Sequence, residues 1–121
     1  MAAARKASAM KIALAPLLAS LPRPATDKWP DGEPFATAIE HGTMSLEVFA
    51  PRGQDRQEPH SQDELYIVVT GTAAFINAGE RMRVGPGDAL FVKAGALHHF
   101  EQMSGDFATW VMFWGPKGGE G

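Results

Sequence analysis

From residue 35 to residue 114, the chain is a series of short runs of β-branched and aromatic residues, separated by turns that contain glycine or proline. Runs of this length and composition predict β-strands, because helices need longer segments with a 3.6-residue period. Eight such strands joined by tight turns indicate an all-β sandwich or barrel. We expect the strands at residues 35–39, 44–50, 64–69, 73–77, 81–84, 89–92, 98–102 and 108–114.

The segment that precedes the strands differs in pattern. Leu14, Leu17, Leu18 and Leu21 recur at helical spacing. This spacing predicts a short amphipathic helix that begins near Pro16. Two alternatives stay open for the same residues, namely a cleavable leader, since basic residues precede the apolar stretch, and disorder.

A chain of 121 residues has the length of one domain. We divide it into an N-terminal helix with a proline-rich connector (1–34), a β-barrel (35–115) and a flexible tail (116–121). The tail prediction rests on its three glycines among six residues, a composition typical of frayed chain ends.

Composition excludes several classes of function. The chain has no cysteine, so disulfides and thiolate metal ligands are impossible, which fits a cytoplasmic protein. Its 11 lysines and arginines are scattered, and the net charge is −3. We therefore expect no nucleic-acid partner. No stretch approaches the length of a membrane span, so we expect no membrane partner either.

Polar residues gather in two segments that border predicted strands. Glu58, His60, Gln62 and Glu64 alternate along the first segment, so in an extended chain their side chains would share one face. In the second segment, a turn leads to His98 at the start of a strand. Imidazole and carboxylate groups together form a plausible site for one divalent ion, with Fe, Mn, Ni and Zn as candidates. A metal-free polar pocket is the alternative.

The first segment resembles the first of the two motifs of the cupin superfamily. That motif ends in a glutamate, six residues and a glycine, which Glu64 and Gly71 reproduce. The family places histidines six and four residues before the glutamate. His60 occupies the second of these positions, whereas Glu58 stands where the first histidine is expected.

The second segment resembles the second cupin motif. Gly87, Gly95 and His98 occur at the family's spacing. Lys93 replaces the family's proline, and Gln102 replaces its asparagine. Both motifs occur in the expected order, and the interval between them accommodates a hairpin. The resemblance extends over about residues 40–114 and is closest to small single-domain bacterial cupins.

The resemblance implies a jelly-roll β-barrel and a set of metal ligands. The implied ligands are His60, Glu64 and His98, with Glu58 as a fourth ligand or as a general base. Gln62 and Tyr66 have the same parity as Glu64. From that shared face we expect Gln62 to be a weak ligand or a hydrogen-bond partner that orients a ligand or bound water, and Tyr66 either to pack in the core or to donate its hydroxyl into the pocket. The implied function is a metal-dependent enzyme that acts on a small organic molecule, such as a dioxygenase or isomerase. The alternative is a non-catalytic module that binds a small molecule or metal. Small cupins often dimerise through edge strands, so we also expect a homodimer.

Other aromatic residues have simpler interpretations. His99 follows His98 and should point to the opposite, solvent-facing side of its strand. His41 lies beside a glycine and is predicted to belong to a turn. Trp110 and Trp114 have the same parity along one strand, and we expect both in the core, together with Tyr66.

Overall fold

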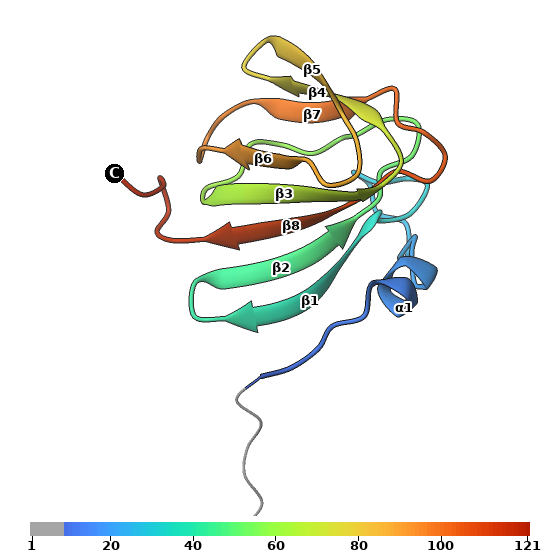
Figure 1. Cartoon of the computed structure of the whole chain (residues 1–121), viewed down its shortest axis with the longest axis horizontal. Helices are drawn as coiled ribbons and strands as arrows, with labels where there is room; N and C mark the ends of the chain where they lie inside the picture. Colours follow the sequence, from blue (N-terminus) through green and yellow to red (C-terminus); the bar gives the residue numbers. More distant parts are fainter. Residues whose placement is uncertain (1–8) are drawn as a thin grey trace, which may run out of the picture.

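The structure, a computed structural model, describes residues 9–121. Two antiparallel sheets pack against each other, and one short helix lies beside the larger sheet (Figure 1). The elements are α1 (Leu14–Ala19), β1 (Phe35–His41), β2 (Met44–Phe49), β3 (Asp63–Thr70), β4 (Ala73–Asn77), β5 (Glu80–Val84), β6 (Ala89–Val92), β7 (His98–Glu101) and β8 (Ala108–Trp114).

The strand order confirms the predicted all-β class. The larger sheet has the order β1-β2-β8-β3-β6, and the smaller has the order β5-β4-β7. Each predicted strand is present, and most bounds differ by one residue or less, although β1 continues two residues further, to His41. Because β8 inserts between β2 and β3, strands distant in the sequence become neighbours in the larger sheet.

Aromatic rings fill the space between the two sheets. Phe100 of β7 packs against Tyr66, Phe75 and Phe107, with ring centroids 4.9–5.2 Å apart. All four residues are at most 1% exposed. Tyr66 is therefore in the core, as predicted. Such ring pairs stabilise the core beyond their burial of apolar surface.

The two tryptophans of β8 correct the sequence prediction. Thr109, Val111 and Phe113 are the buried residues of this strand. Trp110 and Trp114 alternate with them and lie on the outer face of the larger sheet, where both are half-buried. Strand parity placed the two tryptophans together correctly, but hydrophobicity alone does not show which face of a strand is inside when both faces are apolar.

The N-terminal helix is shorter than an average helix and begins earlier than predicted, at Leu14. Pro16 is its third residue, where the missing N–H has no partner within the helix in any case. None of the helical residues is fully buried. Within residues 9–121, no helix is both long and apolar enough to cross a membrane.

The connector after the helix closes one end of the core. Trp29 is 8% exposed, and its ring stands edge-on to Phe35 and Phe49, with centroids 6.4 Å away in both cases. The connector is thus part of the packed structure rather than a loose linker.

The C-terminal tail makes backbone contacts with the start of β3. Gly118 N–H donates to the Ser61 carbonyl at 2.7 Å, and Glu120 N–H donates to the buried Asp63 carboxylate at 3.0 Å. Asp63 also accepts a hydrogen bond from Ala94 N–H. These contacts lower the pKa of Asp63, mainly through Glu120. Glycine composition does not reveal such anchoring.

Gly71 forms the turn between β3 and β4. Its φ is +72°, a conformation that is costly for residues with a side chain. A Cβ atom at this position would lie 2.6 Å from Phe107 Cα and 2.7 Å from Phe107 N. The turn therefore requires glycine both for its conformation and for the close approach of the chain before β8.

Candidate metal centre

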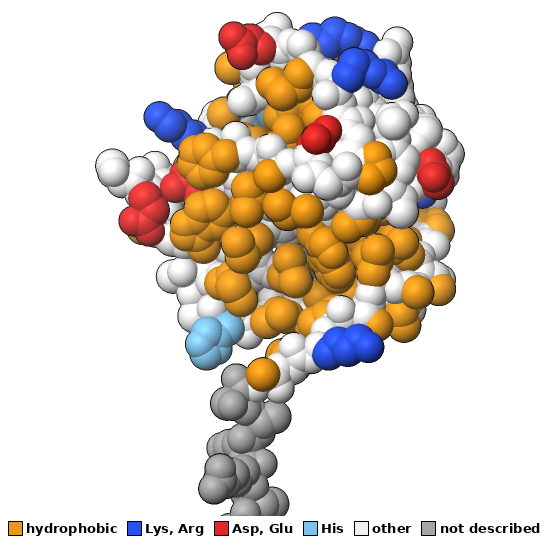
Figure 2. Space-filling view, viewed as in Figure 1, with side chains coloured by type: hydrophobic (Ala, Val, Ile, Leu, Met, Phe, Trp, Pro, Cys, Tyr) orange, Lys and Arg blue, Asp and Glu red, His pale blue; other side chains and the backbone are white. Residues whose placement is uncertain are grey.

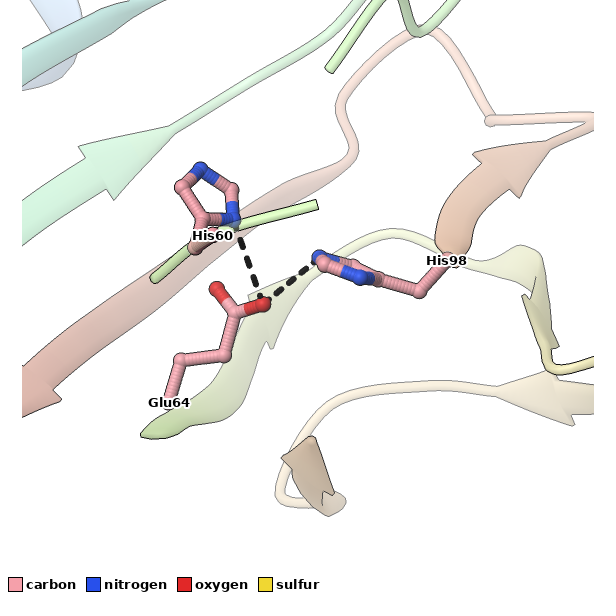
Figure 3. Close-up of side chains that lie close together, drawn as sticks. All are labelled: His60, Glu64 and His98. Carbon is pink, nitrogen blue, oxygen red and sulfur yellow. Dashed lines mark ion pairs between the residues drawn. The ribbon is translucent and has the colours of Figure 1, made fainter. Parts of the chain in front are cut away.

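Three of the predicted site residues converge between the two sheets. Glu64 lies at the start of β3, His98 at the start of β7, and His60 in the loop before β3 (Figure 3). Glu64 Oε1 is 2.6 Å from His98 Nε2 and 3.4 Å from His60 Nδ1. One donor atom from each of the three residues lies within 4.8 Å of the others, close enough for one ion to contact all three.

The backbone fixes which nitrogen of His98 faces the group. His98 Nδ1 is 2.8 Å from the Ala96 carbonyl, so this nitrogen donates a proton and Nε2 is left to face Glu64. Two electron-rich atoms 2.6 Å apart need a proton or a cation between them. A metal ligand histidine is commonly held in this way, with its second nitrogen bonded to a carbonyl.

Two donor atoms of the group have no hydrogen-bond partner among the described residues. These atoms are His60 Nδ1 and Glu64 Oε2, and both are inaccessible to solvent. Burying a polar atom without a partner is costly, so such atoms in a site call for an explanation. A divalent ion would satisfy both atoms. The donor set of two imidazoles and one carboxylate thus fits the predicted ion.

A cavity of about 580 Å³ opens beside this group. His60 and Tyr66 belong to its lining, whereas the side chains of Glu64 and His98 are 1% exposed. Much of the remaining wall is apolar and comes from the connector and the inner face of the larger sheet. These residues are Trp29, Phe35, Phe49, Val111 and Phe113.

Comparison with known proteins identifies the family. Residues 45–114, more than half of the chain, match the family described as the cupin domain. The chain belongs to the cupin family. A crystal structure of a cupin superfamily protein from Desulfitobacterium hafniense has 18% sequence identity and a TM-score of 0.57, and the match covers 66% of this chain and 74% of that one. This cupin therefore has the fold that the two motifs implied.

Matches with individual proteins cover only part of each chain. An uncharacterised protein of Streptomyces coelicolor is 41% identical over 63 residues, which are 52% of this cupin and 60% of that relative. KdgF from Halomonas sp. has 21% identity and a TM-score of 0.60, with 69% and 78% coverage. The DMSP lyase DddQ from Ruegeria pomeroyi has 27% identity and a TM-score of 0.55, and the match covers 69% of this cupin and 48% of DddQ.

Glu58 and Gln62 do not join the three converging residues. The Glu58 side chain is 78% exposed and lies 3.7 Å from Lys28 at the cavity wall. Gln62 donates instead to the Thr43 and Gly115 carbonyls. The expected alternation fails because β3 begins only at Asp63, so the preceding residues do not follow strand geometry. The roles of Glu58 as ligand or base remain predictions.

Tyr66 does contact the group, and it connects to residues that the sequence analysis did not single out. Its hydroxyl lies 3.1 Å from His98 Nε2 and donates to Gln57 Oε1 at 2.8 Å. Gln57 in turn donates through its side chain to Asp55. Asp55 also accepts a bond from Phe100 N–H of β7, which ties this chain to the smaller sheet. Asp55 and Gln57 belong to neither motif, and the contact between Asp55 and Phe100 joins residues 45 positions apart in the sequence.

Glu47 is a second acidic residue that sequence reasoning missed. It belongs to the inner face of β2 and lines the same cavity as His60. Burial raises the pKa of Glu47; His60 opposes this effect, and the charges of Glu64 and Glu40 reinforce it. The sequence did contain a signal for this position. Glu47 has the same parity as Ser45 and Phe49 on β2, and a carboxylate on the inward face of a strand is costly unless it has a function or a partner.

Without metal, the pair of Glu64 and His98 shares a proton. Burial acts to raise the pKa of Glu64, but its contacts with His60 and His98 prevail and the pKa is lowered. Burial acts to lower the pKa of His98, but Glu64 prevails and the pKa is raised. Both shifts favour a cationic His98 imidazole that donates to an ionised Glu64 carboxylate.

These two shifts predict a pH dependence for the metal-free protein. The stabilisation from His98 is complete below about pH 6.5 and is lost as pH rises through its raised pKa. The stabilisation from Glu64 is present above about pH 4.3 and is lost as pH falls through its lowered pKa. We expect the melting temperature in EDTA to be highest between these values, and His98→Gln to flatten the alkaline decline. A melting temperature that rises from pH 6.5 to 8.5 in EDTA would contradict this assignment.

Proposed function

We propose that this cupin holds one divalent metal ion with His60, Glu64 and His98 and acts on a small organic molecule that enters the adjoining cavity. The observation that carries the proposal is the pair of buried donor atoms without partners, together with the 2.6 Å approach of His98 Nε2 to Glu64. The unpartnered buried atoms are costly without a cation, and the short His98–Glu64 approach brings two ligand atoms to the same point.

The donor set narrows the choice of ion. Two imidazoles and one carboxylate suit Fe, Mn, Ni or Zn, and the pattern resembles open sites that leave coordination positions for substrate. When bound, such an ion supplies Lewis-acid polarisation of a substrate oxygen, or a place for dioxygen to bind if the ion is redox-active. Ca²⁺ is disfavoured because it prefers sets made entirely of oxygen ligands.

The residues around the ligands have separate tasks. Tyr66 stays protonated, because burial and the charges of Glu64 and Asp55 raise its pKa well above the usual range. Its proton goes to Gln57, so its hydroxyl oxygen remains as an acceptor beside His98. Glu47, with its raised pKa, is the cavity carboxyl best suited to hold or release a proton near a bound molecule.

The apolar wall of the cavity indicates the kind of molecule that fits. Trp29, Phe35 and Phe49 line it on one side, and they exclude water and accommodate a carbon skeleton. The volume of about 580 Å³ is in the range of small-molecule sites. The likeness to a DMSP lyase supports chemistry on a small organic molecule within this fold, without fixing the reaction.

A second candidate function is a non-catalytic metal-binding or small-molecule-binding module. The observation that favours it is the enclosure of Glu64 and His98, whose side chains are 1% exposed. A structural metal site is closed, whereas a catalytic one keeps an open position. His60, with a side chain 36% exposed, is the member through which a substrate would approach.

Metal reconstitution tests the proposal. Protein purified without an affinity tag is stripped with EDTA and incubated separately with Mn, Fe, Ni and Zn salts, and bound metal is measured by elemental analysis. We expect about one equivalent of at least one ion. We also expect a higher melting temperature, since the ion binds the folded state. Glu64→Gln, which keeps the size of the side chain, should retain neither effect. Failure of all four ions to bind would overturn the proposal.

The same preparation separates the enzyme from the binding module. If the cupin is an enzyme, metal-loaded protein turns over a member of a small-molecule panel, and Glu47→Gln slows turnover while leaving the metal content unchanged. If the ion is structural, its loss lowers the melting temperature and no turnover is found with any ion. Glu33→Gln serves as a matched comparison, because Glu33 lines the same cavity and has no predicted role in catalysis or metal binding.

A further inference from the structure

His60 is the one residue of the candidate metal centre that no strand holds. It lies in the loop before β3, whereas Glu64 and His98 stand at the starts of β3 and β7. Its side chain is also the most exposed of the three, at 36% against 1% for each of the other two. The position of His60 therefore depends on the contacts that its loop makes with other segments.

Residues 115–120, which we call the tail clamp, turn back along this loop. Gly118 N–H donates to the Ser61 carbonyl at 2.7 Å, and the Gln62 side chain donates to the Gly115 carbonyl at 2.9 Å. Figure 1 shows the tail at the end of the sheet where β3 begins, and in Figure 2 the same segment projects at the margin of the molecule, beyond the hydrophobic side chains of the larger sheet. The tail clamp thus contacts the loop from outside the hydrophobic core.

Asp63 connects the tail clamp to the turn between β6 and β7. Its buried carboxylate accepts a hydrogen bond at each oxygen, from Glu120 N–H at Oδ2 and from Ala94 N–H at Oδ1, both at 3.0 Å. The same turn also bonds to the loop directly, since Gly95 N–H donates to the His60 carbonyl at 2.8 Å. Hydrogen bonds to a carboxylate are among the stronger ones in proteins. The loop is therefore held by the turn and by the tail clamp together.

The close approach of the tail clamp requires glycine at position 119. The φ of Gly119 is +88°, which is costly for a residue with a side chain. A Cβ atom there would lie 2.7 Å from Asp63 Oδ1 and 3.2 Å from Ala94 Cβ. The glycine content that predicted a frayed tail instead allows this segment to dock beside β3.

We infer that the tail clamp positions His60 for metal binding, and that it thereby sets how tightly the ion is held and how fast it leaves. The inference rests on the proposed metal centre. Groups that orient a metal ligand without binding the metal change its affinity by about 10–100-fold when they are altered. Because His60 is the exposed ligand, its release is the first step by which an ion would depart.

Metal affinity tests the inference. Each variant is titrated with the ion that the wild type takes up among Mn, Fe, Ni and Zn, and release of that ion to EDTA is followed in time. Gly119→Ala and Asp63→Asn should raise the Kd by about 10-fold or more and speed release by a similar factor. Gly121→Ala is the matched control, since a Cβ there would meet no atom within 4 Å among the described residues. It should leave both quantities unchanged.

A metal-free measurement separates this inference from the proposed function. The chain has four histidines, so the ring nitrogens in ¹⁵N-histidine-labelled protein can be assigned with single-histidine variants. In Gly119→Ala without metal, the NMR signals of His60 should shift or broaden, while those of His41 and His99 stay in place. Equal changes at all histidines would indicate a general loss of structure and would overturn the positioning role.

The two measurements give distinct outcomes. If the wild type binds an ion and both variants of the tail clamp bind it equally well, the inference is wrong and the proposed function stands. If the wild type binds none of the four ions, the proposed function fails. In that case unchanged His60 signals in Gly119→Ala would also overturn the positioning of His60 by the tail clamp, and a selective change at His60 would support it.

Discussion

We expect His98→Ala protein to lose its metal: after dialysis, elemental analysis should give less than about a tenth of an equivalent, against about one equivalent for the wild type. His98 supplies the Nε2 atom 2.6 Å from Glu64 Oε1, and its ring is held in place by the Ala96 carbonyl. Removing one of three ligands leaves a histidine and a carboxylate, too few donors for tight binding. His60→Ala should have the same effect.

The two remaining histidines provide matched controls. His99 lies on the opposite side of β7 and pairs with Glu101, 2.8 Å away. His41 is exposed at the end of β1. His99→Ala and His41→Ala should therefore keep the full metal content. If all four alanine variants bind metal equally, the ion lies elsewhere and the assignment of the site is wrong.

Gly71→Ala should destabilise the protein by more than about 3 kcal/mol, among the largest effects of a single methyl group. Two costs add at this position. A left-handed backbone costs a non-glycine residue about 1–2 kcal/mol. The new Cβ would also lie 2.6 Å from Phe107 Cα, so the chain before β8 would have to move. Denaturant unfolding should show the loss, with a melting temperature lower by about 10 °C or more.

Gly42→Ala isolates the backbone contribution. Gly42, in the turn between β1 and β2, also has a positive φ, +57°, but a Cβ there would meet no atom within 4 Å among the described residues. We expect a cost of about 1 kcal/mol from backbone conformation alone. Equal costs at positions 71 and 42 would show that the contact with Phe107 contributes nothing to the effect.

The strands were predictable because their signals are local. Alternation, β-branched residues and glycine turns lie within each short segment, and they located all eight strands. Motif spacing likewise identified His60, Glu64 and His98, which the structure brings together. The spacing works because each motif is a loop joined to a strand, so a fixed number of residues sets the position of the side chain.

The remaining features depend on contacts between distant segments. Glu58 was grouped with His60 on the assumption that both belong to a strand, but the strand begins only at Asp63. Glu47 reaches the cavity because β2 pairs with β8, a pairing that no local pattern specifies. The outward position of Trp110 follows from the same pairing. Parity gives two faces for each strand, and only the assembled sheet decides which one faces the core.

The ligand set also spans the two layers of the molecule. Glu64 belongs to the larger sheet through β3, whereas His98 belongs to the smaller sheet through β7. An ion held by both would act as a removable cross-link at one end of the sandwich. Openings that separate β3 from β7 would then require the ion to leave. Their contribution to amide exchange would fall as the metal concentration rises.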